Sequence, residues 1–303
     1  MCHVATIDRF HTTLLDWKLP TDAPLLMTAI QTHGVMAPVI CVKDDQGLAI
    51  VDGQQRYRYA KKANQPTIPY VIITPDLPIM TLVSELHRHE LNASTIMKLR
   101  LIRAFKASIT ATLLHHLGLP HYSHIKKDID RICDASFAVQ TFFHAKGYSL
   151  KESVNLLNQS NELRDQYIRD ANHFQFSKRA FDTILCQSTA IMKRDQLSAA
   201  AVLKTLGYDT IRDTDRSPSQ RCAQWMAKLA VAHTPILNAT RHTIDKTLAP
   251  LQKTVKIHYD RTLENAGITL SAHIKKTTDM SDLVAWLNHT DTKHRLTKTL
   301  DLI

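Results

Sequence analysis

The amino-acid sequence predicts an α+β fold in three parts: a small α/β domain, a mainly helical domain, and a C-terminal β-hairpin with a helix. Short apolar runs bounded by Gly, Pro and Asp indicate strands in the first 75 residues. Helical apolar spacing then continues from about residue 92 to 250, and period-two alternation returns in the last fifty residues. We therefore place domains at 1–92, 93–208 and 222–303, with a linker at 209–221.

The first domain is predicted to be a small sheet with helices against it. "HVATI" at residue 3 reads as a strand, and "APLLMTAIQTHG" reads as a helix that ends at Gly34. "APVICV" and "GLAIV" are two strands separated by the turn-rich "KDDQG", which indicates a hairpin or tight connection. "QPTIPYVII" at residue 65 adds a further strand.

The helical domain begins with "NASTIMKLRLIRAFKAS", whose wide apolar face is interleaved with basic residues. Ser149 and Glu152 have the spacing of a capping box, which marks a helix start. The expected linker at 209–221 has no periodicity and is rich in charge and serine. The further helices are expected at about 109–117, 121–132, 135–145, 149–158, 160–171, 178–193 and 198–206.

The C-terminal part is predicted to be a hairpin because apolar residues alternate with polar ones around Ile257 and again around Leu270. "MSDLVAWLNH" at residue 280 reads as a short helix. A hairpin with one helix is marginal by itself. We therefore expect this unit to pack on the body of the protein or on a second copy, as a homodimer.

The net charge of +10 is unevenly distributed. Residues 1–92 hold 8 Lys/Arg and 9 Asp/Glu, whereas residues 93–303 hold 30 and 19. This asymmetry favours a polyanionic partner, with double-stranded DNA as the leading candidate. The alternative is a generally basic, solvated surface.

The composition also narrows the class of protein. No apolar run reaches the roughly 18 residues of a membrane span, so no membrane partner is expected. The start lacks the pattern of a signal peptide. The five cysteines are scattered without a C-x-x-C pair, which favours a reducing cytoplasm, with the protein on the nucleoid or a plasmid.

"VDGQQRYRYAKKA" at residue 51 is the segment richest in chemistry. A strand followed by Asp52-Gly53 and a helix would leave free backbone N–H groups at the helix start, and these attract anions. Arg56 and Arg58 near that start offer guanidinium groups for phosphate oxygens. The alternative is an ordinary amphipathic helix with a basic outer face.

The order of segments around this turn resembles the ParB family. "HGVMAPVICV" fits the family's first motif at Gly34 and Pro38, and "DGQQRYRYA" fits the phosphate-binding turn at Gly53 and Arg56. "SELHRHELN" fits the third motif in length and at Arg88. The resemblance covers roughly residues 4–160 and implies a ParB/sulfiredoxin-like domain followed by a helix-turn-helix domain.

The resemblance implies either binding of cytidine triphosphate with Mg²⁺ or a role in DNA cleavage. Gln54 and Gln55 replace the family's Glu-Arg, so we expect binding more than hydrolysis; no metal site is firmly indicated, and Glu85 is a possible Mg²⁺ ligand. Gln55 also stands where a sulfiredoxin needs its cysteine. The residues implied for nucleotide or phosphate are Gly34, Pro38, Gly53, Gln54, Gln55, Arg56, Arg58, Glu85 and Arg88.

Two other functions stay open at this point. One is a ParB-like nuclease, whose base or metal would come from Asp52, Glu85, His87 and Glu90. The other is a protein-interaction module with a degenerate ParB domain. The seventeen histidines contain no zinc motif, and we interpret most of them as solvated.

Residues 110–132 have the layout of a helix-turn-helix, with Gly118 in the turn and Ile125, Ile129 and Ile132 on one face of the second helix. This segment resembles the ParB-family helix-turn-helix, apart from an insertion at Pro120-His121. The alternative is an ordinary pair of packed helices. The resemblance implies a role in plasmid or chromosome partition or in plasmid-type transcriptional regulation. The predicted DNA-binding residues are Ser123, His124, Lys126, Lys127 and Arg131.

Overall fold

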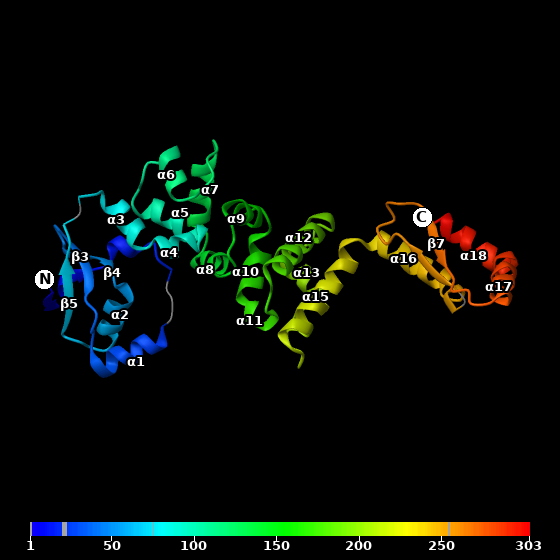
Figure 1. Cartoon of the computed structure of the whole chain (residues 1–303), viewed down its shortest axis with the longest axis horizontal. Coiled ribbons are helices and arrows are strands. Elements are labelled where there is room, and N and C mark those ends of the chain that lie inside the picture. The colour runs from blue at the N-terminus through cyan, green and yellow to red at the C-terminus, as the bar shows by residue number, and fades with distance from the viewer. Residues whose placement is uncertain (1, 20–22, 75, 254) are drawn as a thin grey trace. The chain divides into compact units, whose positions relative to one another are not determined.

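The computed structural model describes residues 2–19, 23–74, 76–253 and 255–303 (Figure 1). The expected domains at 1–92 and 222–303 contain residues 1, 20–22, 75 and 254, which lie outside the described part. The fold is a mixture of helices and strands, with a five-stranded sheet near the start and a two-stranded sheet near the end. The chain divides into two compact units, Met1–Ala171 and Asn172–Ile303.

The five-stranded sheet of the first unit has the order β1-β5-β3-β4-β2. β3 and β4 form the expected antiparallel hairpin, closed at Asp44 opposite Gly47. β5 pairs antiparallel with β1 and parallel with β3, and the two-residue β2 pairs parallel with β4. The strands are β1 (His3–Thr6), β2 (Phe10–His11), β3 (Val39–Asp44), β4 (Gly47–Asp52) and β5 (Thr67–Ile72).

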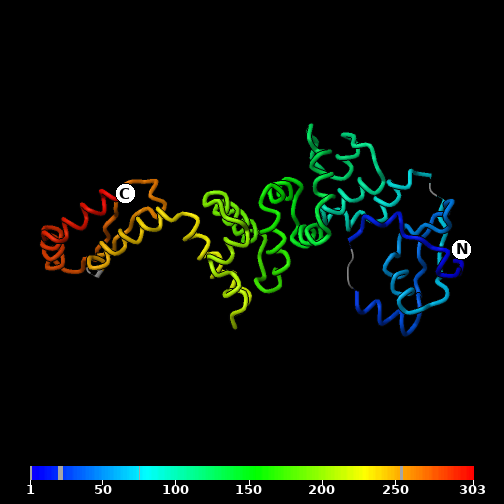
Figure 2. The backbone as a smooth tube through the Cα atoms, turned by 180° about the vertical axis from the view of Figure 1, so that it is seen from behind, coloured from blue at the N-terminus to red at the C-terminus, as the bar shows by residue number. Residues whose placement is uncertain are grey.

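Helices α1 (Pro24–His33) and α2 (Gln54–Lys62) lie side by side next to this sheet (Figure 1, Figure 2). Proline at the first position favours the start of α1, and Gly34, at φ 72°, ends it. The central strands are apolar on both faces, so Val39, Ile50 and Val51 are fully buried. The remaining elements of this part are η1 (Ile7–Arg9), η2 (Thr13–Leu15) and α3 (Ile79–Leu86).

The rest of the first unit is helical, as the periodicity predicts. Serine or threonine side chains cap five of these helices, and Ser149 with Glu152 forms the predicted capping box. The second helix of the expected pair begins at Ile125 rather than 121. The helices are α4 (Arg88–Asn92), α5 (Thr95–Ala104), α6 (Ala111–His116), α7 (Ile125–Asp134), α8 (Phe137–Ala145), α9 (Leu150–Leu157) and α10 (Asn161–Arg169).

The second unit begins with helices packed around aromatic side chains. The ring of Tyr208 stacks on Phe174 at 5.0 Å and meets Trp225 edge-on at 4.9 Å. Most of the expected linker at 209–221 is helical: a short helix buries Tyr208 and Ile211, and the next helix begins in a capping box at Ser217. The helices are α11 (Ala171–Phe174), α12 (Lys178–Arg194), α13 (Ala199–Thr205), α14 (Tyr208–Arg212), α15 (Pro218–His233) and α16 (Pro235–Leu248).

The C-terminal hairpin is present as predicted, with β6 (Lys256–Tyr259) antiparallel to β7 (Ile268–Ser271). It is followed by α17 (Thr277–Asn288) and by α18 (Thr290–Leu300), a second helix that the sequence pattern missed. The hairpin shares a small core with α16, in which Ile244, Leu248 and Ile257 are buried together with Leu251 of η3 (Leu251–Lys253).

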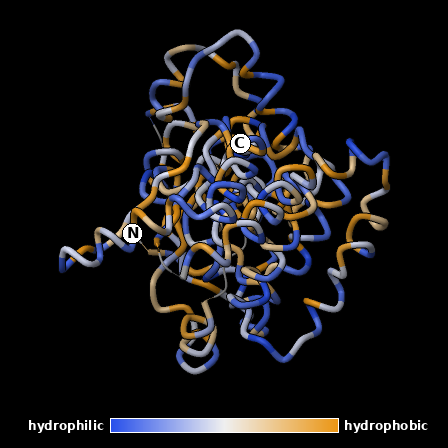
Figure 3. The backbone as a smooth tube through the Cα atoms, turned by 90° about the vertical axis from the view of Figure 1, so that its right-hand side faces the viewer, coloured by the Kyte–Doolittle hydropathy of each residue, from blue (hydrophilic) through white to orange (hydrophobic). Residues whose placement is uncertain are grey.

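Hydrophobic and hydrophilic stretches alternate along the backbone in Figure 3. Within the part of the chain that the structure describes, no helix is both long enough and apolar enough to cross a bilayer.

Candidate anion-binding site

Gly53 connects β4 to α2 in a conformation that requires glycine. Its φ is 95°, and an added Cβ would lie 2.9 Å from Val39 Cγ1 and 3.0 Å from Arg56 Nη2. Glycine is therefore needed both for the left-handed backbone and for the close approach. No side chain caps the start of α2. The helix thus presents the first-turn N–H groups and the positive end of its dipole.

Arg56 faces the protein rather than the open side of this turn. Its guanidinium donates to Asp52 Oδ2 and to the carbonyl oxygen of Pro38, both at 2.8 Å, and to that of Ala37 at 3.3 Å. These contacts tie the start of α2 to the end of β4 and the start of β3. The side chain predicted as a phosphate ligand is thus held by contacts within the protein, although it also lines the cavity described below.

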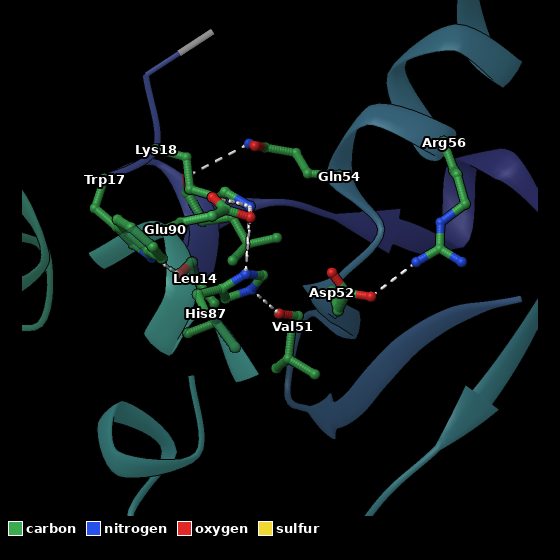
Figure 4. A network of polar contacts seen from close by, with 10 residues as sticks. Leu14, Trp17, Lys18, Val51, Asp52, Gln54, Arg56, His87 and Glu90 are labelled. Atoms are coloured by element: carbon green, nitrogen blue, oxygen red, sulfur yellow. Dashed lines mark hydrogen bonds and ion pairs between the residues drawn. The ribbon is translucent and has the colours of Figure 1, made fainter. Parts of the chain in front are cut away.

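A second polar cluster lies on the other side of the α2 start (Figure 4). Lys18 Nζ donates to Glu90 at 2.8 Å and lies 3.3 Å from His87 Nδ1. His87 is buried, and its Nε2 donates to the carbonyl oxygen of Val51 at 2.7 Å. Because a carbonyl oxygen only accepts, Nε2 carries the proton and is not available as a general base.

Glu90 is held ionised by this cluster. Burial acts to raise its pKa, but hydrogen bonds and charge from His87 and Lys18 outweigh burial and lower the pKa to about 2. Lys18 was not predicted from the sequence. Lys18 directly follows Trp17 and lies 72 residues before Glu90 in the sequence, so only the fold brings the two side chains together.

Lys18, Glu90 and the start of α2 line a cavity of about 640 Å³. The cavity includes five of the nine residues predicted for nucleotide or phosphate. Arg58 is exposed at its edge, and none of the described residues forms an ion pair with it. Gln54 is buried, and its amide donates to the Leu15 carbonyl at 3.4 Å. The lining residues are Lys18, Leu19, Leu26, Asp52, Gly53, Gln54, Gln55, Arg56, Arg58, His89, Glu90, Ala93, Met97 and His144.

The other four predicted residues are not part of this lining. Gly34 ends α1, and Pro38 contributes only the carbonyl that Arg56 holds. Glu85 and Arg88 form an ion pair with each other, and Arg88 lines a separate cavity of about 360 Å³. The nine predicted residues therefore do not form one site. The third motif spans α3 and α4, and its side chains lie at different cavities: Glu90 lines the larger one and Arg88 the smaller one.

The residues present do not fit a resident Mg²⁺ ion. Asp52 is paired with Arg56, Glu85 with Arg88, and Glu90 with Lys18. Among the described residues, no group of three or more His, Cys, Asp or Glu side chains comes together to hold a metal. The nuclease candidates Asp52, Glu85 and His87 therefore serve different contacts and form no common centre.

The predicted DNA-binding residues line one open groove of about 830 Å³ along α7. Ile125, Ile129 and Ile132 are buried as expected, which turns Lys126 and Lys127 outward. Ser123 and His124 precede the helix instead of lying on it. Asp130, Asp134, Asn161 and Arg164 also line the groove.

Arg131 is partly engaged within the protein. Its guanidinium donates to the Leu157 carbonyl and to Asn158 Oδ1, both at 2.5 Å. The segment between α6 and α7 spans residues 117–124, longer than the three- to four-residue turn of a compact helix-turn-helix. Tyr122 fastens this segment by donating to Asp128 Oδ2 at 2.7 Å.

Comparisons with known proteins add little to this geometry. No protein-family model and no curated protein matches the chain. The solved structures that match include the C-terminally truncated chromosome-partitioning protein ParB from Caulobacter crescentus, complexed with CTP-gamma-S, at 16% identity over 61% of this chain and 92% of that chain, with a TM-score of 0.24. The same protein complexed to the centromeric parS site matches at 18% identity over 61% and 97%, also with a TM-score of 0.24. Likenesses at this level carry no argument about fold or function.

Proposed function

We propose that this chain is a ParB-like DNA-binding protein that holds a nucleoside triphosphate in the 640 Å³ cavity. Its role would be in partition of a plasmid or chromosome or in plasmid-type transcriptional regulation, in the cytoplasm. The observation that carries the proposal is the N-terminus of α2, which no side chain caps and which shares a cavity of ligand size with Arg58. Within the described residues, Arg58 forms no ion pair.

The ligand would be bound mainly through its phosphates. The positive end of α2 and the Arg58 guanidinium offer charge-assisted contacts, and His89 and His144 add donors at the wall. Lys18 and Arg56 contribute less, because Glu90 and Asp52 already neutralise them. Since the nearby carboxylates are paired with cations, we expect binding without fast hydrolysis.

Calorimetric titration with CTP, ATP and GTP, with and without Mg²⁺, tests this site. Arg58→Ala should weaken triphosphate binding about tenfold or more, because a charged hydrogen bond contributes roughly 1.5–3 kcal/mol. Lys61→Ala is the matched control, since Lys61 is an exposed cation on the same helix outside the lining. Equal affinities for both variants and the wild type would remove the assignment.

The second half of the proposal is that duplex DNA lies along α7. Lys126 and Lys127 are exposed in the groove, and the strongly positive part of the sequence begins at residue 93. Arg131 supports α7 more than it reads bases, since Leu157 and Asn158 hold its guanidinium.

Fluorescence anisotropy with duplex DNA at several salt concentrations tests the groove. Lys126→Ala with Lys127→Ala should reduce affinity and lower the salt slope by about one for each phosphate that the protein no longer neutralises. Lys151→Ala with Lys146→Ala removes the same charge from α8–α9 as a control. If the two double variants bind DNA equally, the groove is not the DNA site. A chain that binds neither nucleotide nor DNA would instead fit the interaction-module alternative.

A further inference from the structure

The 360 Å³ cavity lies between α3, α4, α5 and α6, away from the lining of the larger cavity. Arg88 of α4, Lys98 of α5, and His115 and His116 of α6 all contribute to its wall, and no carboxylate does. Four cationic or protonatable side chains therefore converge from three helices on one small space. Its volume is near the lower end of roughly 300–1,000 Å³ for ligand sites, which suits a small ligand.

Lys98 is the most informative of these residues. Its side chain is partly buried, and burial lowers the pKa of its ammonium group. Its Nζ lies against the turn after α6, 3.6 Å from where a Cβ of Gly118 would be. Among the residues that the structure describes, none forms a hydrogen bond or ion pair with this ammonium. Burying a cation without a counter-charge costs free energy, which a bound anion would offset.

Glu85 accounts for the other charges around the cavity. It pairs with Arg88, and its Oε1 lies 3.5 Å from His116 Nε2. The Glu85 carboxylate is not part of the lining, so it contacts these two groups from outside the cavity. Lys98 and His115 line the cavity, and neither forms an ion pair with a carboxylate of the described residues.

We propose that this cavity binds inorganic phosphate, with the Lys98 ammonium as the main contact and His115 and Arg88 at the rim. The several oxygens of phosphate accept from donors that approach from different helices, whereas a single-point anion would satisfy only one of them. This site is separate from the nucleotide cavity, and either one can fail without the other.

Amide NMR of the full-length ¹⁵N-labelled protein tests the proposal, with sodium phosphate titrated against sodium chloride at matched ionic strength. The amides of Leu117 and Gly118 should shift in a saturable manner, whereas that of Gly207, in the second unit and outside both cavities, should not. Lys98→Met should weaken this response at least tenfold, and Lys151→Met should leave it unchanged.

His115→Ala provides a second variant, because it removes an exposed ring and leaves the packing around Lys98 intact. It should weaken the phosphate response severalfold. CTP and short duplex DNA, each titrated in phosphate-free buffer, distinguish other sources of phosphate groups. Saturation at Leu117 and Gly118 by either of these but not by inorganic phosphate would overturn the proposal, as would the absence of any saturable shift.

Discussion

Arg56→Ala and Arg58→Ala should differ in their effect on stability, although both residues are cations near the start of one helix. Arg56 donates to Asp52 and to the backbone carbonyls of Ala37 and Pro38, so it fastens α2 to the sheet. Arg58 is exposed and contacts none of these groups. We expect Arg56→Ala to lower the free energy of unfolding of the first unit and Arg58→Ala to leave it nearly unchanged.

The magnitude follows from the hydrogen bonds and the ion pair that Arg56→Ala removes. Each of the two carbonyl hydrogen bonds contributes roughly 0.5–1.5 kcal/mol, and a partly exposed ion pair such as Arg56–Asp52 adds a few tenths. The total decrease is about 2 kcal/mol, which corresponds to about thirtyfold faster exchange of protected amides. An exposed substitution such as Arg58→Ala changes stability by roughly 0.5 kcal/mol or less.

Native-state hydrogen exchange measures this difference in the first unit alone. Unfolding of the whole chain would combine the stabilities of both units in one signal. The amides of β4 that pair with β3 are the reporters. If Arg56→Ala leaves their exchange rates unchanged but abolishes triphosphate binding, the clamp interpretation is wrong and Arg56 is a ligand residue.

Three further outcomes follow from the structure. Gly53→Ala should destabilise the first unit by about 1–3 kcal/mol in the same exchange experiment, more than Gly147→Ala, which shares a positive φ but has no atom within 4 Å of an added Cβ. Glu90 has a pKa of about 2 in the folded protein against 4.5 ordinarily, so its contribution is complete above about pH 4.5 and is lost as the pH falls toward 2. Lys18→Met should flatten that acid loss in a pH series of chemical denaturation, and an unchanged profile would contradict the Lys18–Glu90 assignment. Deletion of residues 251–303 should convert a dimer to a monomer, as measured by light scattering. If both the intact and the shortened protein are monomers, dimerisation through the C-terminal unit is excluded.

Local pattern predicted much of the fold. The β3–β4 hairpin follows from two apolar runs around a turn-rich segment, and the buried face of α7 follows from isoleucines at helical spacing. The missed elements are short or polar. α14 depends on the burial of Tyr208 and Ile211 in a tertiary core, and α18 has only two buried residues, Thr292 and Thr299. Neither presents an apolar periodicity that a sequence reveals by itself.

The sequence predicted the glycine turn before α2, but not the contacts that its charged residues make. Asp52-Gly53 was predicted to form a turn before the basic helix, and Gly53 there has a φ of 95°. The partners of each charge depend on residues far away in sequence. Nothing in the chain near Arg56 shows that the carbonyls of Ala37 and Pro38 will lie beside it, or that Lys18 will meet Glu90.

The division of charges between clamps and free groups explains what this turn can bind. Arg56 is paired with Asp52 and Lys18 with Glu90, so these two cations add little net positive potential to the cavity. The attraction for an anion therefore rests on the α2 N-terminus and on Arg58, which has no such partner among the described residues. The neutral Gln54 and Gln55 keep the first turn free of negative charge. If the proposed site is correct, it would favour association with phosphate groups, and among the described residues it lacks an unpaired carboxylate to direct a metal or a water at them.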